Sequence, residues 1–210
     1  MRGLLIKDFL LIKKSLSFVY IFPLLVILVC GGANIVYLLP MLAMIIPVFF
    51  GFFVNNTLYS DDVSQWGRYA KALPLSLNTT VLEKYLLGLI SIFCGTVLAF
   101  AVCSILAIIT TVEFGYVYLL VYLGFFMSLT YISVLIPSVY KFGVSKGPVV
   151  FIGLISMMIV VPFALDGFNV SIDWTTFIDN PWVFIPVSLA CLIVIYLLSF
   201  KITISILKFV

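Results

Sequence analysis

The chain has 210 residues, of which 65% are hydrophobic and 9% are charged, and it contains no histidine. A soluble domain needs a far more highly charged surface, so the composition excludes a soluble protein and predicts a single all-α membrane domain covering residues 1–210. The net charge of +3 is spread thinly and forms no basic stripe, which argues against nucleic-acid binding.

The basic residues indicate how often the chain crosses the membrane. All 11 fall into four clusters, at residues 2–14, 68–84, 141–146 and 201–208. Short loops rich in Lys and Arg remain in the cytoplasm. Six crossings place every cluster there, whereas five would put the first cluster opposite the others. With about 20 apolar residues needed per crossing, we expect two cytoplasmic termini and spans near 15–31, 35–58, 82–110, 115–140, 148–165 and 182–203.

Residues 2–14 precede the first expected span. On a helical wheel the apolar and basic residues separate, although Asp8 interrupts the apolar side and Ile6 and Leu10 interrupt the basic side. Because Lys13 and Lys14 mark a membrane boundary, we expect an interfacial helix on the cytoplasmic leaflet. The alternative is a ragged start to the first span.

The longest cytoplasmic connection lies between the second and third expected spans, at residues 59–84. Ser60 or Asp61 is suited to cap a short helix over 62–73, which Pro74 ends. Four of its residues share one face at helical spacing, namely Trp66, Tyr69, Ala70 and Leu73. The sequence Thr-Val-Leu-Glu at 80–83 has the form of a capping box that starts the third span.

Two interpretations of this short helix remain open. Its Trp and Tyr side chains are typical of an interfacial helix whose aromatic rings rest among lipid headgroups. The same residue types, together with Arg68, dominate the binding energy of protein interfaces, so the helix is equally suited to dock on a partner.

The sequence lacks the motifs of catalysis. There is no histidine, no P-loop and no serine-hydrolase or zinc-protease motif, so we expect no catalytic site, cofactor or metal in this chain. No ionisable residue falls near the middle of an expected span, which argues against transport driven by an ion gradient. Energy for any uphill transport would have to come from a partner.

Several short segments together resemble the small ABC-2 permease family, the six-span membrane subunits of ATP-binding-cassette exporters. They are, in chain order, Leu5-Ile6-Lys7-Asp8-Phe9, Asp61-Asp62, Trp66, Arg68-Tyr69, Leu73-Pro74-Leu75-Ser76 and Glu83-Lys84-Tyr85.

The resemblance implies an assembly. Two permease copies, identical or similar, would dock on two separate ATPase subunits that bind ATP and Mg²⁺. Helix 62–73 would be the coupling helix, and the N-terminal helix, with Lys7 and Asp8, would lie at the same interface. The coupling-helix residues that would contact the ATPase are Asp62, Gln65, Trp66, Arg68, Tyr69 and Leu73.

The resemblance also implies an activity. Similar permeases export antimicrobial or amphipathic cytolytic peptides, including the phenol-soluble modulins of Gram-positive bacteria. We therefore expect a permease in a bacterial plasma membrane that moves an amphipathic peptide or lipid-like substrate outward. The alternative is a membrane protein that needs no ATPase, either an oligomeric channel or a signalling or assembly subunit.

Overall fold

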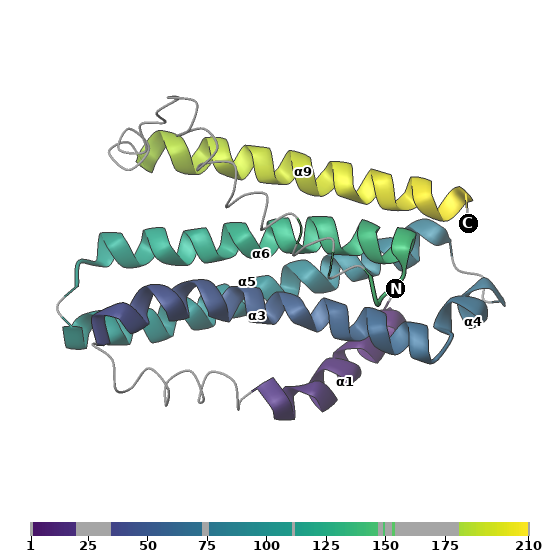
Figure 1. The fold of residues 1–210 in the computed structure, drawn as a ribbon, viewed down its shortest axis with the longest axis horizontal. Helices are drawn as coiled ribbons and strands as arrows, with labels where there is room; N and C mark the ends of the chain where they lie inside the picture. The colour runs from purple at the N-terminus through teal and green to yellow at the C-terminus, as the bar shows by residue number, and fades with distance from the viewer. Residues whose placement is uncertain are drawn as a thin grey trace. The chain divides into compact units, whose positions relative to one another are not determined.

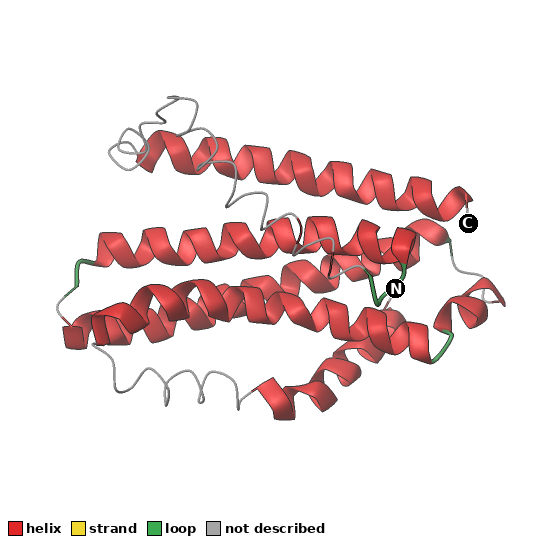
Figure 2. Cartoon of the chain, in the orientation of Figure 1, coloured by secondary structure: helices red, strands yellow, loops and turns green. Residues whose placement is uncertain are grey.

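A computed structural model describes residues 2–19, 35–72, 76–110, 112–146, 149, 153 and 181–209. The regular secondary structure of these residues is entirely α-helical (Figure 1, Figure 2), which agrees with the expected fold class. The chain divides into two compact units, Met1–Ile132 and Ser133–Val210, and each is described by itself. The main helices are α1 (Arg2–Val19), α3 (Ile35–Val63), α4 (Trp66–Ala72), α5 (Leu77–Thr110), α6 (Phe114–Phe142) and α9 (Pro181–Phe209).

Four of the described helices are long and apolar enough to cross a membrane, namely α3, α5, α6 and α9. They coincide with the second, third, fourth and sixth expected spans. The fifth expected span, 148–165, lies almost entirely outside the described residues, as does most of the first, 15–31. Residues 15–19 of the first span continue helix α1.

The two ends of the 59–84 connection differ from the sequence expectation. Helix α3 continues unbroken through Ser60 and Asp61 to Val63, so neither residue caps a new helix. The chain breaks at Ser64 and Gln65 instead, where Gln65 adopts a φ of 52°. The predicted helix start at residue 62 is therefore wrong, and α4 begins at Trp66.

The capping box predicted at residues 80–83 is also wrong. Helix α5 begins at Leu77, and Ser76 caps it, four residues before the predicted cap at Thr80. The Thr79 backbone N–H donates to Ser76 Oγ at 3.3 Å, as expected of an N-cap. Thr80 and Glu83 consequently lie inside the helix, and Glu83 is free to turn its side chain inward.

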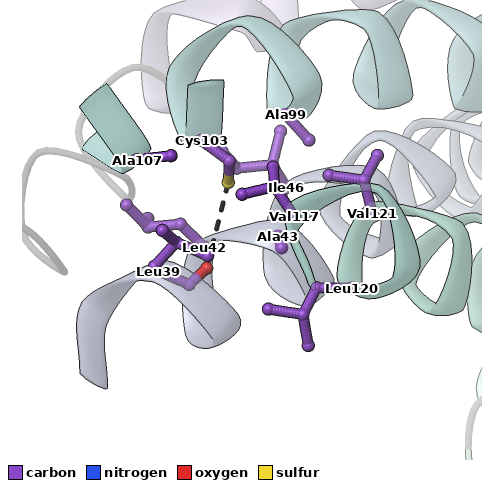
Figure 3. Close-up of a cluster of buried hydrophobic side chains, with 10 residues drawn as sticks. All are labelled: Leu39, Leu42, Ala43, Ile46, Ala99, Cys103, Ala107, Val117, Leu120 and Val121. Carbon is purple, nitrogen blue, oxygen red and sulfur yellow. Dashed lines mark hydrogen bonds between the residues drawn. The ribbon is translucent and has the colours of Figure 1, made fainter. Parts of the chain in front are cut away.

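Helices α3 and α5 lie side by side in the first unit (Figure 1), and α1 packs against both. At the end formed by the start of α3 and the end of α5, aliphatic and small side chains form a buried cluster (Figure 3), which we call the apolar cluster. Helix α6 contributes its first turns, and Cys103 Sγ donates to the Leu39 carbonyl at 3.8 Å. Its members are Leu39, Leu42, Ala43, Ile46, Ala99, Cys103, Ala107, Val117, Leu120 and Val121.

Two glycines permit close approach of the helices in this unit. A Cβ atom on Gly124 of α6 would lie 2.4 Å from the Ala43 carbonyl oxygen of α3. A Cβ atom on Gly95 of α5 would lie 2.8 Å from Phe50 Cβ of α3. Small residues at such crossings allow the backbone contacts that hold helices together in lipid, where the hydrophobic effect supplies no driving force.

In the second unit, helix α9 buries a narrow stripe of small and polar residues. Ser199 Oγ donates a hydrogen bond to the Ser133 carbonyl of α6. Ser188, Leu192 and Thr203 are also buried, whereas most of the other described side chains of α9 are exposed. An apolar helix with so wide an exposed surface is suited to contact with lipid or with another membrane helix.

Candidate functional site

Four charged side chains meet where α1, the end of α3 and the start of α5 come together. Lys7 Nζ lies 2.6 Å from Asp61 Oδ1 and 3.1 Å from Asp8 Oδ1. Lys84 Nζ lies 2.6 Å from Asp61 Oδ2 and also donates a hydrogen bond to Asp8 Oδ2. Each ammonium group thus bridges both carboxylates. We call this closed arrangement of Lys7, Asp8, Asp61 and Lys84 the ion-pair ring.

The position of Asp8 explains why a charge interrupts the apolar side of α1. Leu4, Asp8 and Ile12 follow one another at intervals of four residues, and all three are buried. They form the face of α1 that packs on the rest of the unit. The opposite face exposes Ile6, Phe9 and Leu10. The inner face of α1 therefore supplies Asp8 as the ion-pair partner of Lys84. The outer face is apolar, which suits a helix lying against lipid.

Burial makes the ring sensitive to the loss of any member. The Asp8 side chain is fully buried and that of Lys84 is 4% exposed. A buried charge is tolerated only when it is paired, so removing one partner leaves the other without compensation. Burial lowers the pKa of Lys7, but the hydrogen bond to Asp61 and the charges of Asp8 and Asp61 outweigh it and raise that pKa above 10.5. Lys7 is consequently charged at neutral pH.

Trp66, the first residue of α4, connects this helix to the ring. The Lys7 ammonium lies 4.4 Å from the centre of a Trp66 ring, which is a cation–π contact. Trp66 is half-buried. Because Lys7 in turn binds Asp61 and Asp8, its side chain links Trp66 of α4 to α3 and to the buried face of α1.

The other residues expected to contact a partner divide into two groups. Asp62, Gln65 and Tyr69 are exposed, and Tyr69 retains 65% of its surface. Arg68 lies in α4, but its side chain is outside what the structure describes, and so is the whole of Leu73. The face predicted to unite Trp66 with Tyr69 is thus divided, with Trp66 turned toward Lys7 and Tyr69 toward the surface.

Three charged residues of this site had no predicted role. Two of them, Asp61 and Lys84, belong to the ring, and Glu83 is buried beside it. Asp61 was expected to act as a helix cap, and Glu83 and Lys84 to mark the start of a span. A signal did exist, because Asp8 on the apolar side of α1 and Lys84 beside an apolar span both need a partner once buried. The pairing itself joins residues 76 positions apart, which no local pattern encodes.

The arrangement is suited to transmitting movement between helices. Three helices and the short helix α4 meet through charged and aromatic contacts that depend on position and charge. Within the residues that the structure describes, no group of His, Cys, Asp or Glu is placed to hold a metal ion. The ion pairs of the ring hold α1, α3 and α5 together.

Comparison with known families gives a match to one family. A family model described as an ABC-2 family transporter protein matches residues 3–208, which is nearly the whole chain. Searches among curated proteins and among solved structures find no significant match.

Proposed function

The chain belongs to the ABC-2 family of transporter proteins, which makes it a multi-pass membrane permease of an ABC transporter, and we propose that it works as an exporter. The family implies a partner ATPase. In the proposed assembly, ATP and Mg²⁺ bind to two copies of that separate subunit. The permease forms a dimer with itself or with a similar permease.

The observation that carries the proposal is the contact between α4 and the ion-pair ring. Helix α4 follows α3 and precedes α5 in the chain, and its Trp66 forms a cation–π contact with Lys7 of α1. We assign α4 as the coupling helix on which the ATPase docks. Movement of α4 then pulls on Lys7, and the ring passes the displacement to Asp61 of α3 and Lys84 of α5.

Within this proposal the predicted contact residues have two roles. Tyr69, Gln65 and Asp62 are exposed around α4 and offer the partner an aromatic ring, an amide and a carboxylate. Arg68 and Leu73 stay predicted contact residues, because the structure describes neither side chain. Trp66, Lys7 and Asp8 form the connection behind it, since Asp8 is fully buried and Trp66 half-buried within this chain.

ATP-driven closure of the ATPase pair supplies the outward movement. The cytoplasmic ends of α3 and α5 shift together because the ring ties them to each other and to α1. The apolar cluster at the opposite ends of the same two helices stays packed and serves as the fixed end of this movement. This sequence of movements opens a route to the outside without any ion-binding group in the middle of a described span.

The substrate class follows from the composition of the spans. The apolar helices present Ser, Thr and Asn as polar groups, together with aromatic side chains and few charges. Such surfaces suit an amphipathic peptide or a lipid-like molecule better than a sugar or an ion. The proposed location is the plasma membrane of a bacterium.

Purification of the tagged permease from its own membranes tests the assembly. We expect a P-loop ATPase to co-purify in mild detergent and to hydrolyse ATP in a substrate-dependent manner. Tyr69→Ala should weaken its binding by about 1–4 kcal/mol, the range of an interfacial hot spot. Tyr116→Ala is the matched control, since Tyr116 is an exposed tyrosine at the start of α6, away from α4.

The alternative, an ATPase-independent channel or a signalling or assembly subunit, makes the opposite prediction. The permease would purify as an intact oligomer without an ATPase, and Tyr69→Ala would behave like Tyr116→Ala. That result would overturn both the exporter mechanism and the role assigned to α4.

A further inference from the structure

A fifth charged residue, Glu83, lies beside the ion-pair ring without belonging to it. Its side chain is 2% exposed, and its Oε1 atom has no hydrogen-bond partner in the described part of the chain. None of the four ion pairs among the ring residues includes it. The adjacent residue, Lys84, is already bound by both aspartates.

The ring is electrically balanced without Glu83. Two ammonium groups, of Lys7 and Lys84, face two carboxylates, of Asp8 and Asp61, and each carboxylate oxygen lies beside one ammonium. An ionised Glu83 would add a surplus negative charge in a buried position. A buried charge without a counterion is strongly unfavourable, and proteins relieve it by neutralising the group.

Asp8 and Glu83 are close enough to interact, and both have a buried oxygen without a hydrogen bond. The Asp8 atom without a hydrogen bond is Oδ1. It forms an ion pair with Lys7, but Lys7 donates its hydrogen bond to Asp61. An ionised carboxylate can only accept hydrogen bonds, so two such groups side by side repel each other. One proton on Glu83 would remove the surplus charge and supply the missing donor.

We propose that Glu83 is a proton-binding site beside the ion-pair ring. Glu83 takes a proton from water and stays a neutral carboxylic acid while α1, α3 and α5 are held together. When the helices separate, water reaches the group and the proton is released to it. The charged groups that act on it are Lys7 and Asp8 of α1 and Lys84 of α5, and both lysines also pair with Asp61 of α3. The proton stays on Glu83 beside the ring and is not transported.

The proposal concerns the permease alone and does not depend on the transport activity. Infrared spectroscopy of the purified protein in lipid nanodiscs detects a protonated carboxyl group directly by its carbonyl band. At a pH of about 6, above the ~4.3 of an exposed glutamate, we expect this band in the wild type and its loss in Glu83→Gln. Glu113→Gln, at an exposed glutamate before α6, should leave the band unchanged.

Two results would overturn the assignment. One is a wild-type spectrum without the band at this pH. The other is a band that persists in Glu83→Gln, and its loss in Asp8→Asn would then move the proton to Asp8. Because glutamine is neutral and nearly isosteric, Glu83→Gln should fold.

The pH dependence of stability provides a second, independent measurement. The folded wild type would hold one proton more than the unfolded chain, so its stability must fall as pH rises. The unfolding equilibrium constant should increase by up to about tenfold per pH unit where Glu83 is protonated only in the folded state. Glu83→Gln should lose this slope. An equal slope in both proteins would contradict the proposal.

Discussion

Helices α3 and α5 run side by side, yet their two ends are joined by opposite kinds of contact. At one end, the apolar cluster joins them through Leu39, Ala43, Ala99 and Cys103, with no charged group among its members. At the other end, Asp61 of α3 and Lys84 of α5 lie in direct contact within the ion-pair ring.

The difference matters because the two kinds of contact respond to different changes. Close packing of small and aliphatic side chains depends on shape and is insensitive to charge. A ring of buried ion pairs depends on every charge being present and can be opened by the loss of one charge, by a partner or by a new position of α4. The same two helices therefore have a fixed end and an end whose contacts can be switched.

The largest expected effect comes from removing Lys84, the more deeply buried of the two cations that pair with both aspartates. Lys84→Met leaves the buried Asp8 without its hydrogen-bond donor and Asp61 with one counterion fewer. We expect the free energy of unfolding to fall by about 3–5 kcal/mol, measured by denaturation in detergent. Lys201→Met is the control, because Lys201 is an exposed lysine of α9, and it should change stability by no more than about 0.5 kcal/mol.

A second variant determines whether lost charge pairing causes that effect. In the double variant Lys84→Met, Asp8→Leu the uncompensated carboxylate is gone, and Lys7 still pairs with Asp61. Replacing a buried ion pair by apolar residues is often nearly neutral. Most of the lost stability should return. If the double variant is as unstable as Lys84→Met, Lys84 acts through packing and the contrast between the two ends fails.

The next effect tests the fixed end. Gly124→Ala places a Cβ atom 2.4 Å from the Ala43 carbonyl oxygen, a contact that only a backbone shift can relieve. Overpacking of this kind costs about 1–3 kcal/mol, and it should do so equally at every pH at which the protein is folded. Gly115→Ala in the same helix has nothing within 4 Å of the new Cβ and should not destabilise. If the loss of stability in Gly124→Ala depended on pH, the apolar cluster and the ion-pair ring would no longer differ in their sensitivity to charge.

The two ends of α3 and α5 also differ in how well their contacts can be predicted from the sequence. Apolar length predicts helices α3, α5, α6 and α9, since a run without charge is a local property. The resemblance of the 61–85 segment to the ABC-2 permeases points to the family that the match over residues 3–208 establishes. Lys7 and Asp8 were predicted as interface residues, whereas their pairing with Asp61 and Lys84 was not.

The reason is that pairing depends on where the helices begin and end. Ser60 and Asp61 have the composition of a helix cap, but burial of Leu58 and the contacts of Asp61 extend α3 beyond them. Residues 80–83 match a capping box, yet Ser76 begins α5 earlier and leaves Glu83 inside it. Tertiary contacts thus overrode the predicted cap at Ser60 and Asp61, whereas an earlier local cap, Ser76, replaced the box predicted at 80–83.

The smallest expected effect concerns the contact of Trp66 with Lys7. Trp66→Leu removes the cation–π contact and should lower stability by about 0.5–2 kcal/mol at neutral pH. The pKa of Lys7 is raised above 10.5, so its charged form contributes fully below that value and is lost as pH rises through the raised pKa. The difference between wild type and Trp66→Leu should therefore be constant near neutrality and shrink in strongly alkaline solution.

Tyr69→Leu serves as the matched control for this comparison. Tyr69 is an aromatic residue of the same helix that is largely exposed, so its loss should change stability by less than about 0.5 kcal/mol at any pH. A Trp66→Leu cost that persists unchanged after Lys7 loses its proton would mean that Trp66 stabilises α4 by apolar packing alone. Helix α4 would then have no charge-dependent connection to the ring, and a displacement of α4 would have to reach α3 through the turn at Ser64 and Gln65 instead.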